Sequence, residues 1–273
     1  MFKKFLTLIV IVGVAALFVG CPPSEEVIEP PSNLTISADN TGTMVELRWD
    51  ASPTEDIDGY IVYFKPINGE FNPIDTVNVT NYTHNPDGLA GEYQVTAYKD
   101  DNESDPTETV SSVPVANDVV TVYELNGAGS AGYGWDRTSG AGATYPMAQA
   151  ASAASVDFYI TNFTAGVDVL PYYIASPDVA RQSAYDATIV PDAPWRVNGI
   201  KQVDGITANS VLPQAGEYLN FEQLIGNVYF GVHTEDNYYG LIYTEGTPNT
   251  TEGTQDIRTW FQLVQGLRII NHE

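Results

Sequence analysis

Three histidines are the side chains of this chain best suited to exchange protons near neutral pH, so their positions limit the catalytic chemistry. His84 lies in the first third, His272 is next to the last residue, and His233 precedes an acidic turn. A serine hydrolase would need one of them as a base, and the G-x-S-x-G turn of such enzymes is absent. A triad centred on His233 with Ser130 or Ser139 is the arrangement that such chemistry would require here.

Two acidic segments carry residue types that bind metal ions. His233 is followed by Glu235 and Asp236, and residues 100–105 gather four carboxylates, whose oxygens are the ligands that calcium prefers. Consecutive turn residues rarely converge on one ion, and the acidic run lacks the spacing of an EF-hand loop. We therefore predict a solvated hairpin tip and a solvated acidic turn, with no metal, and calcium at the acidic turn is the alternative. Nothing in the sequence selects a carboxylate pair for glycoside cleavage.

Residues 127–132 match G-x-G-x-x-G, the pattern of dinucleotide-binding loops. In such loops the motif opens a helix whose N-terminus faces the pyrophosphate. Here residues 133–142 continue with further glycines instead of an apolar helical pattern. The segment therefore predicts a glycine-rich surface loop, and we expect no cofactor.

Aromatic side chains are plentiful after residue 116, and they are the best candidates for contact with a ligand. Rings in loops can stack on the faces of sugars, and Trp and Tyr add a polar atom at one end. We predict Trp135 and Trp195 as ligand contacts, with Tyr172 and Tyr173 as further candidates. Packing of their own loops is the commoner role of such rings and remains the alternative. Trp260 is predicted to be a core residue.

The first residues have the construction of a secretory signal peptide: Lys3 and Lys4 precede an uncharged apolar run. The run ends at Cys21, the only cysteine of the chain. Residues 18–21, Phe-Val-Gly-Cys, resemble the lipobox of bacterial lipoproteins, with Phe where Leu is usual. The resemblance implies cleavage after residues 1–20 and lipidation of Cys21. A transmembrane anchor is the alternative, but roughly 16 apolar residues are short for a hydrocarbon core of about 30 Å.

Net charge limits the partners of this chain. With 11 Lys and Arg against 35 Asp and Glu, it cannot offer the cationic surface that nucleic acids require. Cleavage would leave 9 basic residues and a net charge of −26, so the membrane partner is expected through the lipidated Cys21 alone. Residues 21–30 are rich in proline and predict an extended tether. No Asp follows Cys21, which by resemblance to lipoprotein sorting favours the outer membrane or cell surface.

A length of 273 residues predicts about two folded units, and the many Tyr, Gly and Pro residues favour strands and turns. Residues 31–115 alternate apolar and polar side chains at 44–50, 59–65 and 92–98, which predicts strands. Asn68-Gly69 and Asp87-Gly88 predict tight turns between them. The side chains expected to face inward are Val45, Leu47, Trp49, Tyr93, Val95 and Ala97.

Residues 31–115 resemble a fibronectin type III domain. The matching features, in chain order, are Pro31 with Leu34, the Trp-bearing strand at residues 45–49, the next strand at 58–63, the tyrosine-corner strand at 93–97, and Glu103-Ser104 before the last strand. The resemblance implies an immunoglobulin-like β-sandwich that presents or binds other molecules without catalysis of its own.

Residues 116–273 predict a second β-rich domain, either a sandwich or a jelly roll, so the fold class is all-β. A β-hairpin is predicted at 227–243, and residues 147–154 and 221–225 predict short helices. The predicted strands are residues 119–125, 156–163, 167–174, 228–233, 238–244 and 260–270.

The leading functional prediction is a non-catalytic binding or adhesion lipoprotein, exposed at the surface, that binds carbohydrate. In this hypothesis the first domain holds the second away from the membrane, and the protein is not an enzyme. An envelope component that binds other proteins through sheet edges or acidic faces is the second hypothesis. A secreted hydrolase with its site in residues 116–273 is the third.

Overall fold

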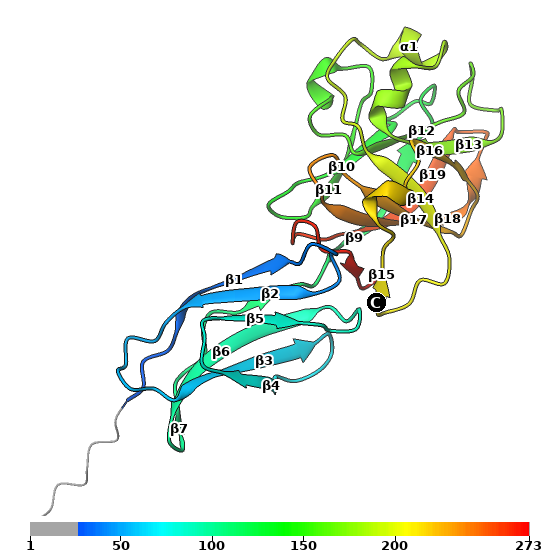
Figure 1. The fold of residues 1–273 in the computed structure, drawn as a ribbon. Helices are drawn as coiled ribbons and strands as arrows, with labels where there is room; N and C mark the ends of the chain where they lie inside the picture. The colour runs from blue at the N-terminus through cyan, green and yellow to red at the C-terminus, as the bar shows by residue number, and fades with distance from the viewer. Residues whose placement is uncertain (1–26, 273) are drawn as a thin grey trace, which may run out of the picture.

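The computed structural model describes residues 27–272, which form two β-sandwich domains joined end to end (Figure 1). The predicted signal peptide, the lipidated Cys21 and most of the predicted tether lie outside the described residues. Within residues 27–272 no helix has the length and apolar character needed to cross a bilayer.

The first domain packs two antiparallel sheets against each other. One sheet has the strand order β1-β2-β5, the other has the order β4-β3-β6-β7, and β8 pairs with β6. The strands are β1 (Ser32–Ala38), β2 (Val45–Asp50), β3 (Gly59–Pro66), β4 (Asn72–Val77), β5 (Asn81–His84), β6 (Gly91–Lys99), β7 (Asn102–Glu103) and β8 (Val110–Ser111).

The strands and inward faces predicted for this domain are confirmed. Predicted strands 44–50, 59–65 and 92–98 coincide with β2, β3 and β6 to within one residue at each end. All six side chains expected to face inward are buried, because successive residues of a strand point to opposite faces of its sheet. Trp49 packs edge-on against Tyr60, with ring centroids 5.5 Å apart.

The second domain also packs two antiparallel sheets of five strands each. Their orders are β11-β10-β12-β13-β16 and β14-β17-β18-β19-β9, and β15 pairs with β20. The strands are β9 (Val115–Tyr123), β10 (Gly132–Trp135), β11 (Gly142–Tyr145), β12 (Phe158–Thr161), β13 (Tyr172–Ala175), β14 (Gly199–Val203), β15 (Ser210–Val211), β16 (Phe221–Leu224), β17 (Tyr229–His233), β18 (Tyr239–Asn249), β19 (Thr254–Phe261) and β20 (Ile269–Ile270).

Short helical segments cover the outer face of the β12 sheet, where α1 lies above the strands in Figure 1. They are η1 (Ala150–Ser152), η2 (Pro177–Arg181) and α1 (Asp186–Ile189), and a further helical turn, η3 (Ala215–Glu217), follows β15. Apolar side chains from these connections pack on Tyr159 and Ala175 of the sheet. The central strands β10 and β12 are therefore buried on both faces.

The second domain differs from the sequence predictions at one predicted helix and at the extent of two predicted strands. Residues 221–225 were expected to be helical, but β16 occupies them because Phe221 to Leu224 hydrogen-bond along β13. Long-range pairing outweighs the weak local preference of so short a segment. The predicted hairpin at 227–243 is confirmed as β17 and β18. Each predicted strand overlaps an observed one, but most of 167–174 and 260–270 is loop.

The end of the described chain returns to the first domain. After β19, Val264, Leu267 and Ile269 join the apolar cluster that fills the first sandwich. The backbone N–H of Arg268 donates to the carbonyl of Gly42 at 2.8 Å, in the turn between β1 and β2. The two domains therefore share part of one core at their junction.

Candidate functional site

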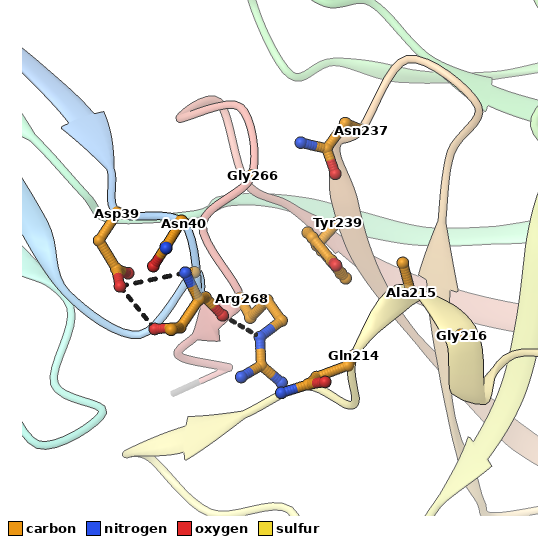
Figure 2. Close-up of a pocket in the computed structure, with 11 residues that line it drawn as sticks. Asp39, Asn40, Gln214, Ala215, Gly216, Asn237, Tyr239, Gly266 and Arg268 are labelled. Atoms are coloured by element: carbon orange, nitrogen blue, oxygen red, sulfur yellow. Dashed lines mark hydrogen bonds between the residues drawn. The ribbon is translucent and has the colours of Figure 1, made fainter.

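A polar cavity lies between the two domains, and we call it the interdomain pocket (Figure 2). Its volume is about 400 Å³, within the range of cavities that hold small ligands. The lining residues are Asp39, Asn40, Thr41, Gly42, Gln214, Ala215, Gly216, Asn237, Tyr239, Gly266 and Arg268.

The turn between β1 and β2 forms the wall from the first domain. Asp39 shapes it: one carboxylate oxygen accepts from the N–H and hydroxyl of Thr41 at 3.0 and 2.6 Å. The other accepts from the N–H groups of Thr43 and Met44 at 3.0 and 2.9 Å. Partial burial raises the pKa of Asp39, but these hydrogen bonds outweigh it and lower the pKa below its ordinary value. The carboxylate is therefore ionised at neutral pH.

Arg268 forms the floor of the pocket and joins both domains. Its Nε donates to the carbonyl of Thr41 at 2.8 Å, and its Nη1 donates to the carbonyl of Leu212 at 2.6 Å. Only 9% of the residue is exposed, so two carbonyls replace much of the water that its charge would otherwise bind. Gly42 has φ of +70°, and a Cβ there would lie 2.3 Å from the carbonyl oxygen of Gly266. The close approach of the two domains thus requires glycine at this position.

The opposite wall comes from the second domain, and in Figure 2 Asn237 and Tyr239 lie across from Asp39 and Asn40. Burial raises the pKa of Tyr239, so its phenol is neutral. The side-chain oxygen of Asn237 is 3.1 Å from Nε2 of His233. Gln214, at the N-cap of η3, is exposed at the lower rim.

The chemistry of this lining favours binding over catalysis. One cation, one carboxylate and three side-chain amides surround it, and all of them can hydrogen-bond a polar ligand. None of its eleven described residues is His, Ser, Cys or Glu. Asp39 is held by four donors, which leaves it poorly suited to move a proton during a reaction. The pocket therefore presents hydrogen-bond donors and acceptors to a polar ligand.

Sequence reasoning did not find this pocket. Asn40, Gln214, Asn237 and Arg268 lie on four separate segments, and none of those segments carries a motif. The sequence signal closest to the pocket is the pair of glycines at the junction. Gly42 and Gly266 both have positive φ, a conformation that favours glycine.

Trp135, predicted as a ligand contact in a glycine-rich loop, lies instead in β10 with 3% of its surface exposed. Its indole stacks on Phe261 with ring centroids 5.1 Å apart, and Nε1 donates to the hydroxyl of Thr259 at 3.0 Å. A Cβ on Gly240 would lie 2.8 Å from the indole, so glycine there makes room for the ring. The indole has no free face for a ligand and packs the core between the sheets.

Two more of the predicted ligand contacts are buried. Trp195 is 6% exposed, packs with the connections over the β12 sheet, and donates from Nε1 to the carbonyl of Pro191 at 3.3 Å. Tyr172 is fully buried between the sheets, its hydroxyl donates to the carbonyl of Val167, and burial raises its pKa to about 12. Trp260, expected in the core, is buried as predicted.

Tyr173 is the one predicted contact that reaches the surface. It packs with Phe163 and Phe221 at centroid distances of 5.0 and 5.6 Å, and we call these three rings the aromatic surface cluster. Phe221 is 44% exposed. Beside the rings lies a shallow hollow of about 280 Å³ lined by Phe163, Val179, Gln182, Ser183 and Phe221.

The hairpin tip between β17 and β18 is exposed at Glu235 and Asn237, as predicted, but its two carboxylates also bond to neighbouring segments. Asp236 accepts from Nε of Arg137 at 2.7 Å, and Glu235 accepts from the N–H of Val197 at 2.9 Å. Arg137 also pairs with Asp157, which is fully buried, through both of its terminal nitrogens at 2.8 and 2.9 Å. The carboxylates at the tip therefore hold the protein together.

The structure also places residues that the sequence offered for metal binding or for nucleophilic catalysis. In residues 27–272 no group of three or more His, Cys, Asp and Glu side chains is placed to hold a metal ion. In the acidic turn, Glu103 accepts from the hydroxyls of Tyr63 and Thr96 at 2.7 and 2.6 Å. The hydroxyl of Ser139 donates to Asp136 at 2.8 Å. The glycine motif at 127–132 leads into β10 and not into a helix.

Comparisons with known proteins bear on the first domain. Residues 29–113 match the sequence model of the fibronectin type III domain. No curated protein matches this chain. Among solved structures, it is similar to a Fn3-like protein from Clostridium thermocellum, at 24% identity and a TM-score of 0.28, over 32% of this chain and 92% of that one.

Two further structures are similar at lower identity. The FN5 domain of Drosophila Lar shares 18% identity at a TM-score of 0.26, over 31% of this chain and 94% of that one. A segment of two fibronectin type III domains from chicken tenascin shares 15% identity at a TM-score of 0.28, over 86% of this chain and 99% of that one. The match to the family model identifies residues 29–113 as a fibronectin type III domain, a kind of domain that generally serves as a non-catalytic binding or structural module, and a second β-sandwich is joined to it.

Proposed function

We propose that this protein is a non-catalytic binding protein of the bacterial cell envelope that holds carbohydrate in its interdomain pocket. The lipid on Cys21 anchors it, and the fibronectin type III domain places the pocket away from the membrane. In this proposal neither domain catalyses a reaction.

The anchor is proposed from the sequence around Cys21. The only cysteine of the chain directly follows an apolar segment and small Gly20, which is the position of the lipidated residue in a lipobox. Acyl chains at that site would give stable attachment to a membrane. Replacing Cys21 with Ser is expected to move the chain from the membrane fraction to the soluble fraction of lysed cells. Retention in the membrane fraction after this change would count against lipid anchoring.

The observation that carries the carbohydrate proposal is the lining of the interdomain pocket. Hydroxyl groups both donate and accept hydrogen bonds, and the amides of Asn40, Gln214 and Asn237 do the same. Arg268 and Asp39 add a donor and an acceptor of opposite charge. A polar pocket at a domain boundary is also where proteins commonly bind small molecules.

The test is retention of the full chain, purified in detergent, on a panel of immobilised polysaccharides with and without calcium. Asn40→Ala combined with Gln214→Ala removes two exposed amides of the pocket and is expected to weaken retention about tenfold or more. Gln149→Ala, an exposed amide with no side-chain cap contact on another part of the second domain, is the control and should change nothing. Failure of every polysaccharide to retain the chain would exclude this function.

A second candidate function is supported by the aromatic surface cluster. Its rings and hollow are mainly apolar, which suits an apolar side chain of another envelope protein better than a sugar. Cross-linking on intact cells would test it. A cross-linked partner that disappears with Phe221→Ser but persists with Val79→Ser, at a similarly exposed site in the first domain, would support a protein-binding role.

A further inference from the structure

We propose that the interdomain pocket recognises the end of an uncharged saccharide chain, one or two sugar units, and does not bind an internal stretch of polysaccharide. This inference rests on the proposed carbohydrate-binding function and names the ligand class of the same site. Size, charge and the placement of hydrogen-bonding groups each contribute to it.

The size of the pocket limits the ligand to a short saccharide. A volume of about 400 Å³ lies at the lower end of the range for small-molecule sites. Its walls come from both domains, with Asn40 on one side, Tyr239 on the other, and Arg268 below (Figure 2). A site that binds an internal stretch of a polysaccharide needs a long open face. The exposed rings suited to such a face lie elsewhere, in the aromatic surface cluster.

The charge of the pocket favours a neutral ligand. Arg268 and Asp39 contribute one positive and one negative charge, so the lining has no net charge. The positive charge is partly compensated by the carbonyls of Thr41 and Leu212, as the bond lengths of 2.8 and 2.6 Å indicate. An anionic sugar would also approach a chain whose net charge is −24, which opposes its association.

The remaining hydrogen-bonding groups match sugar hydroxyls. The side-chain amide of Gln214 is exposed at the N-cap of η3, where the backbone N–H of Glu217 donates to the backbone carbonyl of Gln214 at 2.9 Å. The side-chain oxygen of Asn237 lies 3.1 Å from Nε2 of His233, so the NH₂ group of Asn237 is the end that remains for a ligand. Asn40 is exposed on the facing wall and offers both a donor and an acceptor. A sugar unit between these walls can therefore bridge the two domains through its hydroxyls.

Calorimetric titration of the full chain in detergent with neutral monosaccharides and disaccharides, and with the corresponding uronic acids, tests this inference. We expect a neutral sugar to bind at least about tenfold more tightly than its uronic acid and to displace the chain from the polysaccharide that retains it. Asn40→Ala should weaken the affinity for the monosaccharide about threefold to tenfold, while Gln149→Ala leaves this affinity unchanged.

The outcomes separate this inference from the function on which it rests. Retention by a polysaccharide that no monosaccharide or disaccharide displaces would overturn end recognition and leave carbohydrate binding in place. A uronic acid that binds as tightly as its neutral partner would overturn the assignment of a neutral ligand. Absence of binding to every saccharide, polymeric or not, would overturn both.

Discussion

The two domains of this protein differ in whether ionisable side chains lie in their interiors. Within the described residues, every buried polar side chain of the first domain is a serine or threonine: Ser52, Thr96, Ser104, Thr107 and Ser112. The second domain buries serines and threonines too, but it also buries ionisable groups, namely Glu124, Asp157, Asp186 and Arg268.

The difference follows from how the strands are connected. The first domain has short turns between regular strands, and side-chain hydroxyls are enough to satisfy the backbone groups beside them. The Ser112 hydroxyl, for example, accepts from the N–H of Gly91 and donates to its carbonyl, both at 3.0 Å. The second domain must hold long connections on its sheets. Asp157 accepts from Arg137 and from Arg196 at 2.7 Å, which joins three separate segments. Buried charges therefore hold loops in this protein.

The largest expected effect is the loss of that charge network. Asp157→Ala leaves Arg137 and Arg196 without their shared buried partner and should lower the free energy of unfolding by about 3–5 kcal/mol. Ser104→Ala in the first domain removes only hydroxyl contacts and should cost about 1 kcal/mol. Denaturant unfolding of both variants measures the contrast, and equal losses would contradict the difference drawn between the domains.

The next effect concerns the shared core at the junction. Leu267 is fully buried against the first sandwich although it belongs to the last part of the chain, so Leu267→Ala should cost about 2–5 kcal/mol. Amide hydrogen exchange should accelerate in β2 and β6 of the first domain. Leu241→Ala, equally buried in the second domain, is the control and should accelerate exchange around β18 instead. Unchanged exchange in the first domain after Leu267→Ala would mean that the domains are independent.

A smaller effect is expected where the two domains touch through glycine. Gly42→Ala places a side chain against the backbone of Gly266 at positive φ and should cost about 1–3 kcal/mol. Gly205→Ala has φ of +66° but nothing within 4 Å of the new Cβ, so it carries the backbone penalty alone. Comparing their melting temperatures isolates the contact between the domains. If Gly42→Ala costs no more than Gly205→Ala, the junction is looser than the structure indicates.

The smallest effect is a difference in pH dependence. Burial raises the pKa of Asp186 above its ordinary value, outweighing its hydrogen bonds with Tyr159, Thr161 and Ser183. Because the folded pKa is the higher one, the stability this group contributes is present below its unfolded pKa and is lost as pH rises through the folded value. Asp186→Asn should therefore lose less unfolding free energy than the wild type as the pH rises above about 4, the ordinary pKa of an Asp carboxyl. Parallel stability curves for the two proteins would show that Asp186 does not contribute in this way.

The sequence predicted the first domain in detail and the second mainly in outline. Alternation at residues 44–50 and 92–98 located β2 and β6, because a half-buried strand repeats every two residues regardless of its partners. The same pattern located the hairpin of β17 and β18. Residues 221–225 were predicted as a helix because a five-residue segment carries too little periodicity to identify its pairing with β13.

Aromatic composition showed that large rings matter in the second domain, but it could not say which of them meet solvent. Trp135 is enclosed because Gly240 and Phe261, which are distant in sequence, leave a space of its shape. Phe221 is exposed because β16 lies at the edge of its sheet. Ring exposure is a property of neighbours brought together by folding, and local sequence does not encode it.

By itself, the sequence determined the apolar first segment, the acidic charge, the all-β composition and the alternation that specifies the first sandwich. Each of these depends on residue types or on neighbours within a few positions. Only the tertiary structure decided the interdomain pocket, in which Asn40, Asn237 and Arg268 meet. Their meeting depends on how Leu267 enters the first core and on the close contact at Gly42, and these long-range contacts form only when both domains are folded.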